Sequence, residues 1–441
     1  MSLFHEMPFP LVAIILAVIG ALIGSFINLG VYQLGYFLRR PVSPWSTLPD
    51  SYKSKLGKRS WLDLIPVFGW LRLRRESSEF GKLHWLRPMA IEIFAAAGLV
   101  AMFWWYNQGG LGTNTEEISS PEDGLLRSWN SLWFIFHATL FILLAIATFI
   151  DFDERTIPDW ITIPGTLFAL LVTAFASQVR LPIQKANLVD QSVLPLNFNS
   201  PYGIPEWHHS STGLMVGILI IGFWCFGLLP KLVTLRFGLV KGIKFFLATL
   251  IPMPRKNQSP QRSHNRGFNV FHFAVLAVFV VSCVWSWFVW QRGGDNWDSL
   301  FGSLLGMAMG GGLTWAVRII AGLALRVEAM GFGDVTLMAM IGAFVGWQPA
   351  LLIFAIAPFT SILIALSQKL TTGDPKIAFG PYLCLATVIV VIGWRPIWNE
   401  WASQGIFSMG APILLAIIGG ALAMMGLMLL GLGLSRRRYE E

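Results

Sequence analysis

Two aspartates stand where a long apolar run meets a short polar turn. Asp151 follows the apolar stretch that ends at Ile150, and Asp334 follows the turn Gly331-Phe332-Gly333. Two carboxyls that share one site do not both ionise readily. One can then act as general base toward water while the other, still protonated, polarises a carbonyl. The pattern predicts that Asp151 and Asp334 form a catalytic pair that hydrolyses a peptide bond without a metal ion.

Asp334 also has a structural explanation. A helix is predicted to begin at Val335, and aspartate is a common residue at helix N-termini, where it caps free backbone amides. The glycines at 331 and 333 permit positive φ and close approach of another chain segment. The motif by itself is therefore compatible with a simple helix cap.

Asp151 is open to a similar alternative, because charges are frequent at the ends of membrane spans. Asp153 and Asp159 follow closely and are rival carboxylates for the same role. Arg155, four residues after Asp151, is at the spacing of a helical ion pair. The pair is a stronger signal than either member, since ionisable residues near membrane depth are functional candidates.

The composition predicts the elements that carry these residues. The chain has 441 residues, of which 55% are hydrophobic and 13% charged, against about 25% charged in soluble domains. Several continuous apolar runs reach the roughly 20 residues that a helix needs to cross a bilayer. The fold class is therefore all-α, a polytopic helical membrane protein in contact with the lipid bilayer. The candidate apolar segments are 9–33, 88–106, 130–150, 160–177, 212–230, 268–290, 299–322, 335–346, 349–367, 380–394 and 409–433.

The distribution of charge predicts the topology. The loops 34–87 and 231–267 and the tail at 436–438 are basic, whereas the loop 107–129 is acidic. The positive-inside rule makes the basic segments cytoplasmic, with the N-terminus outside and the C-terminus inside. This alternation delivers both Asp151 and Asp334 to the cytoplasmic face. The net charge of +8 is thereby explained by loops, and nucleic acid is not expected as a partner.

Other chemistries have less support. The sequence has neither a phosphate-binding Gly-Lys-Ser/Thr loop nor a His-Glu-x-x-His zinc pair. The neighbouring His208 and His209 lie in a predicted external loop and are at most weak metal candidates, and His137 lies within a span. The three cysteines are dispersed within apolar stretches and match no zinc or disulfide pattern. No metal site is predicted.

Several stretches together resemble the type IV prepilin peptidases, GxGD aspartyl proteases of bacterial membranes. Ile150 to Asp159 is similar to that family's first active-site stretch, and Gly331 to Asp334 to its second. The further similar stretches are Gly24 to Tyr32, Trp61 to Val67, Arg87 to Glu92, Gly346 to Gln348 and Phe379 to Pro381.

The resemblance implies an activity. Members cleave the basic leader of prepilins or pseudopilins at the cytoplasmic face of the bacterial inner membrane, without a cofactor. Asp151 and Asp334 match the catalytic aspartates. The residues expected to support them are Gly331, Gly333, Asp153, Pro158 and Asp159.

Many members of that family also methylate the new N-terminus, with S-adenosylmethionine as methyl donor. The residues related to this second activity that are retained here are Gly24, Asn28 and Glu92. Two Cys-x-x-Cys pairs bind zinc in the cytoplasmic loop of many members, but the loop 34–87 contains no cysteine, and position 33 is Gln where Arg is usual. Zinc is therefore not expected, and methylation is less certain than proteolysis.

The spacing of the two aspartates is much longer than in the resembled family. The excess falls mainly in 178–297, which holds a long external loop (178–211), two extra spans and a basic linker at 252–266. Two spans preserve the side on which Asp334 emerges. The chain is thus divided into 1–129, with the first two spans and the basic loop; 130–177, with Asp151; the insertion 178–297; and 298–441, with the GxGD segment. About eight spans are family-like and two or three are extra.

Two other classes of function remain open. A transporter or channel would use the aspartates to bind a cation or proton, although transporter sites usually lie at the membrane midplane. A non-catalytic scaffold of a pilus or secretion system would need neither carboxylate.

Overall fold

Long apolar helices make up most of the structure, a computed structural model. It describes residues 7–36, 43–46, 52, 55–56, 59–111, 123–184, 193–229, 265–325, 330–371 and 379–440. The predicted basic linker lies outside these residues up to position 264. The α-helices are α2 Phe9–Gln33, α4 Phe68–Leu73, α5 Ser77–Phe80, α6 Leu86–Asn107, α7 Asp123–Glu154, α8 Asp159–Phe175, α9 Ser211–Leu228, α11 Asn265–Arg292, α12 Gly294–Leu325, α13 Phe332–Val345, α14 Trp347–Thr371, α15 Gly380–Ile392, α16 Trp394–Pro396 and α17 Ala411–Glu440.

Shorter elements join these helices. They are the 3-10 turns η1 Trp61–Leu64, η2 Arg74–Glu76, η3 Ser177–Val179, η4 Glu206–His209 and η6 Phe407–Met409, the π-helical η5 Ile397–Ala402, and the strands β1 Pro182–Gln184 and β2 Val193–Pro195. The strands pair antiparallel with Ile183 opposite Leu194. The sequence predicted no element here. Tryptophans from distant helices hold β1 and the residues before it. Trp394 Nε1 donates to the Pro182 carbonyl at 2.8 Å, and Trp133 Nε1 donates to the Arg180 carbonyl at 3.1 Å.

The helices confirm the all-α, polytopic prediction. Each of the eleven predicted apolar segments contains a helix. Among the described residues, seven helices are long and apolar enough to cross a membrane, or eight if the pair Gly380–Ile392 and Trp394–Ala402, bent by 74°, forms one crossing. α8 and α13 are shorter, with 17 and 14 residues. Every residue of α13 from Asp334 to Val345 is buried, so this helix is enclosed by protein and need not match the bilayer thickness.

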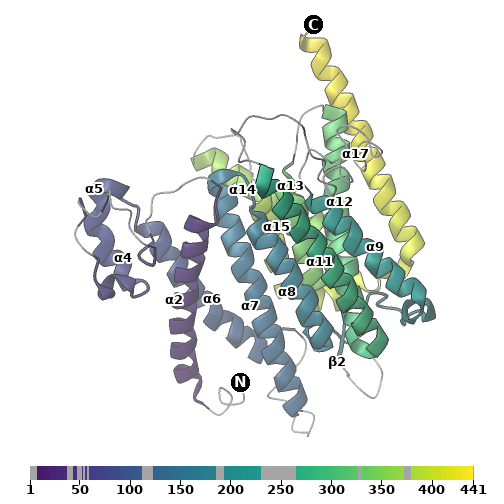
Figure 1. Cartoon of the computed structure of the whole chain (residues 1–441), viewed down its shortest axis with the longest axis horizontal. Coiled ribbons are helices and arrows are strands. Elements are labelled where there is room, and N and C mark those ends of the chain that lie inside the picture. Colours follow the sequence, from purple (N-terminus) through teal and green to yellow (C-terminus); the bar gives the residue numbers. More distant parts are fainter. Residues whose placement is uncertain are drawn as a thin grey trace.

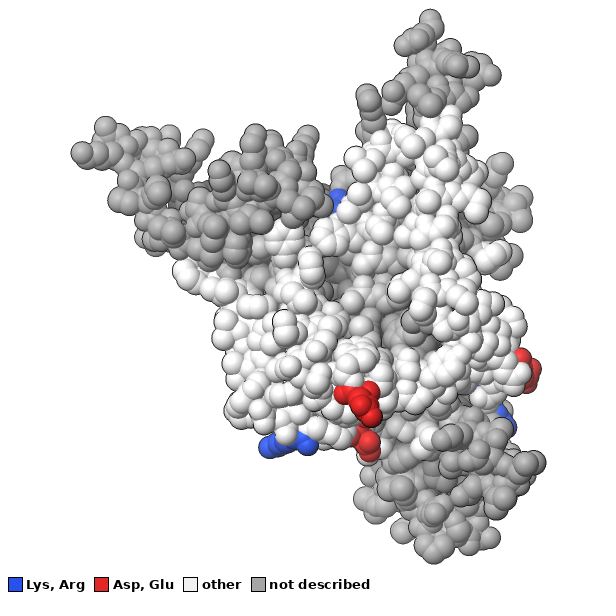
Figure 2. Space-filling view, turned by 90° about the vertical axis from the view of Figure 1, so that its right-hand side faces the viewer, with Lys and Arg blue, Asp and Glu red and all other residues white. Residues whose placement is uncertain are grey.

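The helices stand side by side in one bundle (Figure 1). α2 and α6 pack together at one edge, and α12 and α13 pack together in the interior. The side of the molecule seen in Figure 2 carries a broad uncharged belt, with most of its coloured acidic and basic residues near the lower edge. An uncharged belt bounded by charge is the surface expected where a protein meets lipid.

Glycines lie at the contact between α12 and α13. A Cβ added at Gly306 of α12 would lie 2.0 Å from the carbonyl oxygen of Gly342 in α13, and one added at Gly342 would lie 2.0 Å from that of Gly306. Small residues let membrane helices approach to backbone contact. This pair therefore sets the position of α13, and with it that of Asp334.

Replacing Gly306 by alanine is expected to destabilise the bundle. The added methyl group would overlap backbone rather than a movable side chain, and overpacking of this kind costs about 1–3 kcal/mol or more. The melting temperature in detergent should fall for Gly306→Ala. Gly312→Ala is the control, because nothing lies within 4 Å of its added Cβ, and it should melt like the wild type. Equal melting of both variants would contradict the proposed backbone contact.

Candidate active site

Four chain segments meet around the two predicted aspartates: the end of α7, the turn that follows it, and the first turns of α13 and α15. Asp151 lies in the last turn of α7 and Asp334 in the first turn of α13. Their exposed fractions are 5% and 8%, and the two carboxyls are close enough for their charges to interact. The tertiary structure thus brings together the two residues that the sequence paired.

Backbone amides hold both carboxyls. The N–H of Gly380, at the start of α15, donates to Asp151 Oδ2 at 3.1 Å. The N–H of Gly331, the N-cap of α13, bonds to the Asp334 carboxyl. Asp334 therefore does cap its own helix, as the simpler explanation of the motif held, and it faces Asp151 as well. One carboxyl can fill both roles because it has two oxygens with several acceptor positions.

The glycines are required by close packing. A Cβ at Gly380 would lie 2.6 Å from Asp151 Oδ2, and one at Gly333 would lie 2.9 Å from the Cβ of Ile157. Gly331 is less crowded, because a Cβ added there would lie 3.6 Å from its nearest neighbour, Asp334 Oδ2. Gly333 and Gly380 thus let the starts of α13 and α15 touch the turn after α7, which narrows the space around the carboxyls.

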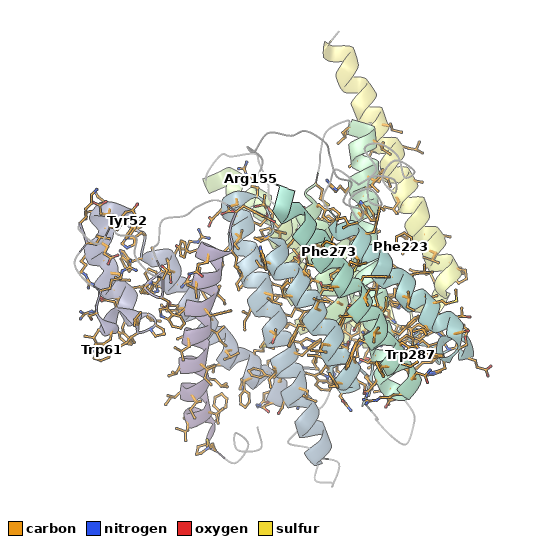
Figure 3. The ribbon with its side chains drawn as sticks, viewed as in Figure 1. Tyr52, Trp61, Arg155, Phe223, Phe273 and Trp287 are labelled. Atoms are coloured by element: carbon orange, nitrogen blue, oxygen red, sulfur yellow. The ribbon has the colours of Figure 1, made fainter. Side chains whose placement is uncertain are left out.

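The turn after α7 contains the other predicted supporting residues. Arg155 has a φ of 55° and ends the helix, and its backbone N–H bonds to the Asp151 carbonyl at 2.9 Å. Pro158 is buried and is the N-cap of α8. Asp159 lies in the first turn of α8, where its backbone N–H bonds to the hydroxyl of Tyr36. Arg155 stands at one end of the bundle in Figure 3.

Asp153 is engaged elsewhere. Its Oδ1 accepts a hydrogen bond from Arg87 Nη1 at 2.7 Å, and Arg87 also bonds to the carbonyl of Phe149. This ion pair ties α7 to the first turn of α6. The neighbouring Glu154 accepts the backbone N–H of Tyr36 at 2.8 Å. Asp153 and Glu154 therefore both bind other segments of this chain, α6 and the residues after α2.

Three residues at the site were missed by sequence reasoning. Gly380 was noted only as part of a motif. Tyr382 is buried, its hydroxyl has no hydrogen-bond partner among the described residues, and it interacts electrostatically with Asp151. Arg318 of α12 donates from Nε to the Met330 carbonyl at 3.0 Å and lies over the Phe332 ring. An arginine inside a predicted span was the one available signal.

Gly24, Asn28 and Glu92 converge in a second buried cluster. The Glu92 Oε1 atom accepts from Ser25 Oγ at 2.6 Å, Trp70 Nε1 at 2.8 Å and Asn28 Nδ2 at 3.3 Å. Its Oε2 accepts from the Val67 N–H. A Cβ at Gly24 would lie 2.5 Å from the Glu92 Cα, so α2 and α6 are in backbone contact there. Glu92 thereby joins α2, α6 and the small helical unit 59–85, which contains α4 and α5.

A buried ion-pair cluster holds that unit together without cysteines. Asp63 is fully buried, and it accepts from Arg75 Nη2 at 2.6 Å and Arg72 Nε at 3.0 Å. The Ser60 N–H completes a capping box with the same carboxylate. Burial raises the pKa of Asp63, but these hydrogen bonds outweigh burial and lower the pKa to about 2. The unit lies beside α2, with Tyr52 and Trp61 marking its position (Figure 3).

Comparison with known proteins supports the sequence resemblance. The model of the bacterial Peptidase A24 N-terminal domain matches residues 18–106, and that of the type IV leader peptidase family matches residues 269–366. The second match contains Asp334 and begins inside the predicted insertion; Asp151 lies outside both. These two stretches of the chain are thus similar to the type IV leader peptidase family and to its bacterial N-terminal domain.

Curated relatives carry the name prepilin leader peptidase/N-methyltransferase. That of Escherichia coli K12 is 35% identical over 97 residues, 22% of this chain and 41% of the relative. That of Aeromonas hydrophila is 32% identical over 108 residues, covering 24% and 35%. That of Pseudomonas putida is 30% identical over 183 residues, covering 37% and 56%. The chain thus aligns with about a third of the length of the first relatives. No solved structure shows a significant match.

Acid is expected to loosen the unit 59–85 selectively. Asp63 has a folded-state pKa of about 2, below the roughly 3.9 of an unfolded aspartate. Its contribution to stability is therefore fully present above about pH 4 and is lost as the pH falls toward 2. Limited proteolysis by pepsin should cut this unit increasingly over that range.

The variant Asp63→Asn should already be cut at neutral pH by a neutral protease. Glu79→Gln is the matched control. The Glu79 carboxylate is partly exposed, and its distance of 4.0 Å from the Lys55 amine is long for an ion pair, so this variant should behave like the wild type. Resistance of Asp63→Asn to cleavage would show that the ion-pair cluster does not stabilise the unit.

Proposed function

We propose that this protein is a membrane aspartyl endopeptidase that removes the leader of type IV prepilins or pseudopilins at the cytoplasmic face of the bacterial inner membrane. The observation that carries the proposal is the pairing of Asp151 and Asp334, two buried carboxyls with interacting charges at one end of the bundle. The matches to the family models and the names of the relatives support the substrate class.

Two adjacent buried carboxyls share their protons unequally, because a second negative charge beside the first is unfavourable. The ionised member would take a proton from water as the water oxygen attacks the scissile carbonyl. The protonated member would donate a hydrogen bond to the carbonyl oxygen, on which negative charge develops. A proton then passes to the leaving amine as the C–N bond breaks, and the pair returns to its starting state.

The amides around the pair restrict its geometry. The Gly380 N–H fixes one oxygen of Asp151 and the Gly331 N–H bonds to Asp334, which leaves the remaining oxygens for water and substrate. Preorganised donors avoid reorganisation during the reaction. The Tyr382 hydroxyl has no hydrogen-bond partner among the described residues and interacts electrostatically with Asp151, and we assign it to a hydrogen bond with the substrate or the attacking water.

An apolar cavity of about 580 Å³ lies between α2, α6, α7 and α15. We assign it to the apolar helix of a membrane substrate. Its α7 wall runs from Ala138 to Phe149, two residues before Asp151. A substrate helix lying against this wall would present the chain at its cytoplasmic end to the carboxyls. This arrangement fits a leader that is cut just before an apolar helix.

A transporter is less well supported, because both carboxyls lie at one end of the bundle rather than at its middle.

N-methylation would be a second activity, separate from proteolysis. Glu92 accepts four hydrogen bonds from this chain, from Ser25, Asn28, Trp70 and the Val67 N–H, and thereby joins α2, α6 and the unit 59–85. We assign Glu92 a structural role and derive no methyl-transfer step; the mass of the processed N-terminus would reveal whether a methyl group is added.

Leader removal should depend on both carboxyls of the pair. In cells that co-express a pilin-like precursor, Asp151→Asn and Asp334→Asn are each expected to slow cleavage by roughly 10²–10⁴-fold or more. Asp153→Asn is the matched control: it lies two residues from Asp151 but pairs with Arg87, so cleavage should persist. Cleavage by either catalytic variant at the wild-type rate would rule out the dyad, and an inactive Asp153→Asn would reassign it.

Gly380→Ala should impair cleavage without unfolding the protein. The added methyl would displace the Asp151 carboxylate, which it would approach to 2.6 Å. The rate constant for leader removal should fall while the melting temperature changes little. Gly419→Ala in α17, which meets nothing within 4 Å, serves as the control. Full activity of Gly380→Ala would show that the Asp151 position does not depend on this contact.

A further inference from the structure

A cluster of two histidines and an aspartate lies at the end of the bundle opposite the paired carboxyls. His208 and His209 close η4, directly before α9, and Asp298 lies in the first turns of α12. The Asp298 Oδ1 atom is 3.3 Å from His208 Nδ1 and 3.7 Å from His209 Nε2. One ligand atom from each residue falls within 4.8 Å of the others. Trp287 of α11 marks this end of the bundle in Figure 3.

These separations match a metal site. Zinc binds imidazole nitrogen and carboxylate oxygen at about 2.0–2.2 Å in a tetrahedron, which places neighbouring ligand atoms roughly 3.3–3.6 Å apart. The two distances from Asp298 Oδ1 to the histidine nitrogens, 3.3 and 3.7 Å, lie close to that range. A set of two imidazoles and one carboxylate suits zinc and related divalent transition metals.

Three buried polar atoms of the cluster have no hydrogen-bond partner among the residues that the structure describes. His208 is fully buried, and neither of its ring nitrogens has a hydrogen-bond partner among the described residues. The Asp298 Oδ1 atom is also buried without a hydrogen bond. Buried polar groups in proteins are nearly always paired, so these atoms call for a ligand.

The surroundings hold the ligands in place. Trp297 Nε1 donates to the His208 carbonyl at 3.1 Å and Trp290 Nε1 to the His209 carbonyl at 3.2 Å. The His208 ring is also packed against Phe198 and Phe301, with ring centroids 4.8 and 4.6 Å away. Fixed ligand orientation of this kind is typical of metal sites. The exposed side chain of His209 leaves the cluster open to solvent.

We propose that His208, His209 and Asp298 bind one divalent transition-metal ion of the zinc class, with solvent in the fourth position. The site joins the loop before α9 to the start of α12, two segments that are distant in the sequence. It lies away from the paired carboxyls and requires nothing of the proposed peptidase activity. Asp295, one turn before Asp298, adds negative charge that favours a cation.

Metal binding by the full chain tests the proposal. The protein would be purified in detergent with a tag that lacks histidine, stripped with EDTA, and titrated with Zn²⁺ against a chromophoric chelator. We expect one tightly bound ion per chain. Co²⁺ in place of Zn²⁺ should give the intense visible absorption of a tetrahedral site. His209→Ala and Asp298→Asn should each weaken binding by more than the roughly 10–100-fold that loss of an outer-shell partner costs.

The control variant is His84→Ala, which removes a histidine of the unit 59–85 and should bind zinc like the wild type. His209 is exposed, so its alanine variant is expected to fold, and an unchanged melting temperature of the EDTA-treated protein would establish this. The proposal is overturned if wild type and the His209→Ala/Asp298→Asn double variant bind zinc equally, or if wild type binds less than one ion per chain.

Discussion

Two effects oppose the placement of two carboxyls together in a largely apolar environment: the loss of their hydration and their mutual repulsion. The rest of the structure depends on meeting this constraint. Asp151 and Asp334 are each held by a backbone amide, from Gly380 and Gly331 respectively. Close packing requires glycine at 380 and at 333, where an added Cβ would lie within 3 Å of neighbouring atoms, whereas Gly331 has room for one. The Gly306–Gly342 contact between α12 and α13 extends the same requirement into the bundle.

The remainder of the protein surrounds this arrangement with units of different character. The helical unit 59–85 is joined to α2 and α6 through Glu92, and its interior is stabilised by Asp63 with Arg72 and Arg75. An ion-pair cluster and a buried carboxylate hub thus hold a loop that contains no cysteine. At the other end of the bundle, tryptophans bond to the backbone of the loop before α9.

Much of the fold and part of the site were predictable from the sequence. Continuous apolar runs identified each of the eleven segments as helical, because a backbone in lipid must satisfy its own hydrogen bonds. The segment 335–346 is visibly shorter than its neighbours in the sequence, but only the packing shows that α13 is enclosed by them. The two aspartates were identified by their position at span ends. Asp153 was a rival carboxylate in the sequence, and the structure pairs it with Arg87.

The sequence by itself determined the helical class, the pairing of Asp151 with Asp334 and the segments that carry them, because hydrophobic length and local turn chemistry are written in consecutive residues. Only the tertiary structure decided which groups surround the pair. Gly380, Tyr382 and Arg318 come from helices far along the chain, and Asp298 reaches His208 and His209 across the insertion. Contacts of this kind depend on how helices pack, and packing is set by shape complementarity between distant segments, which no local pattern records.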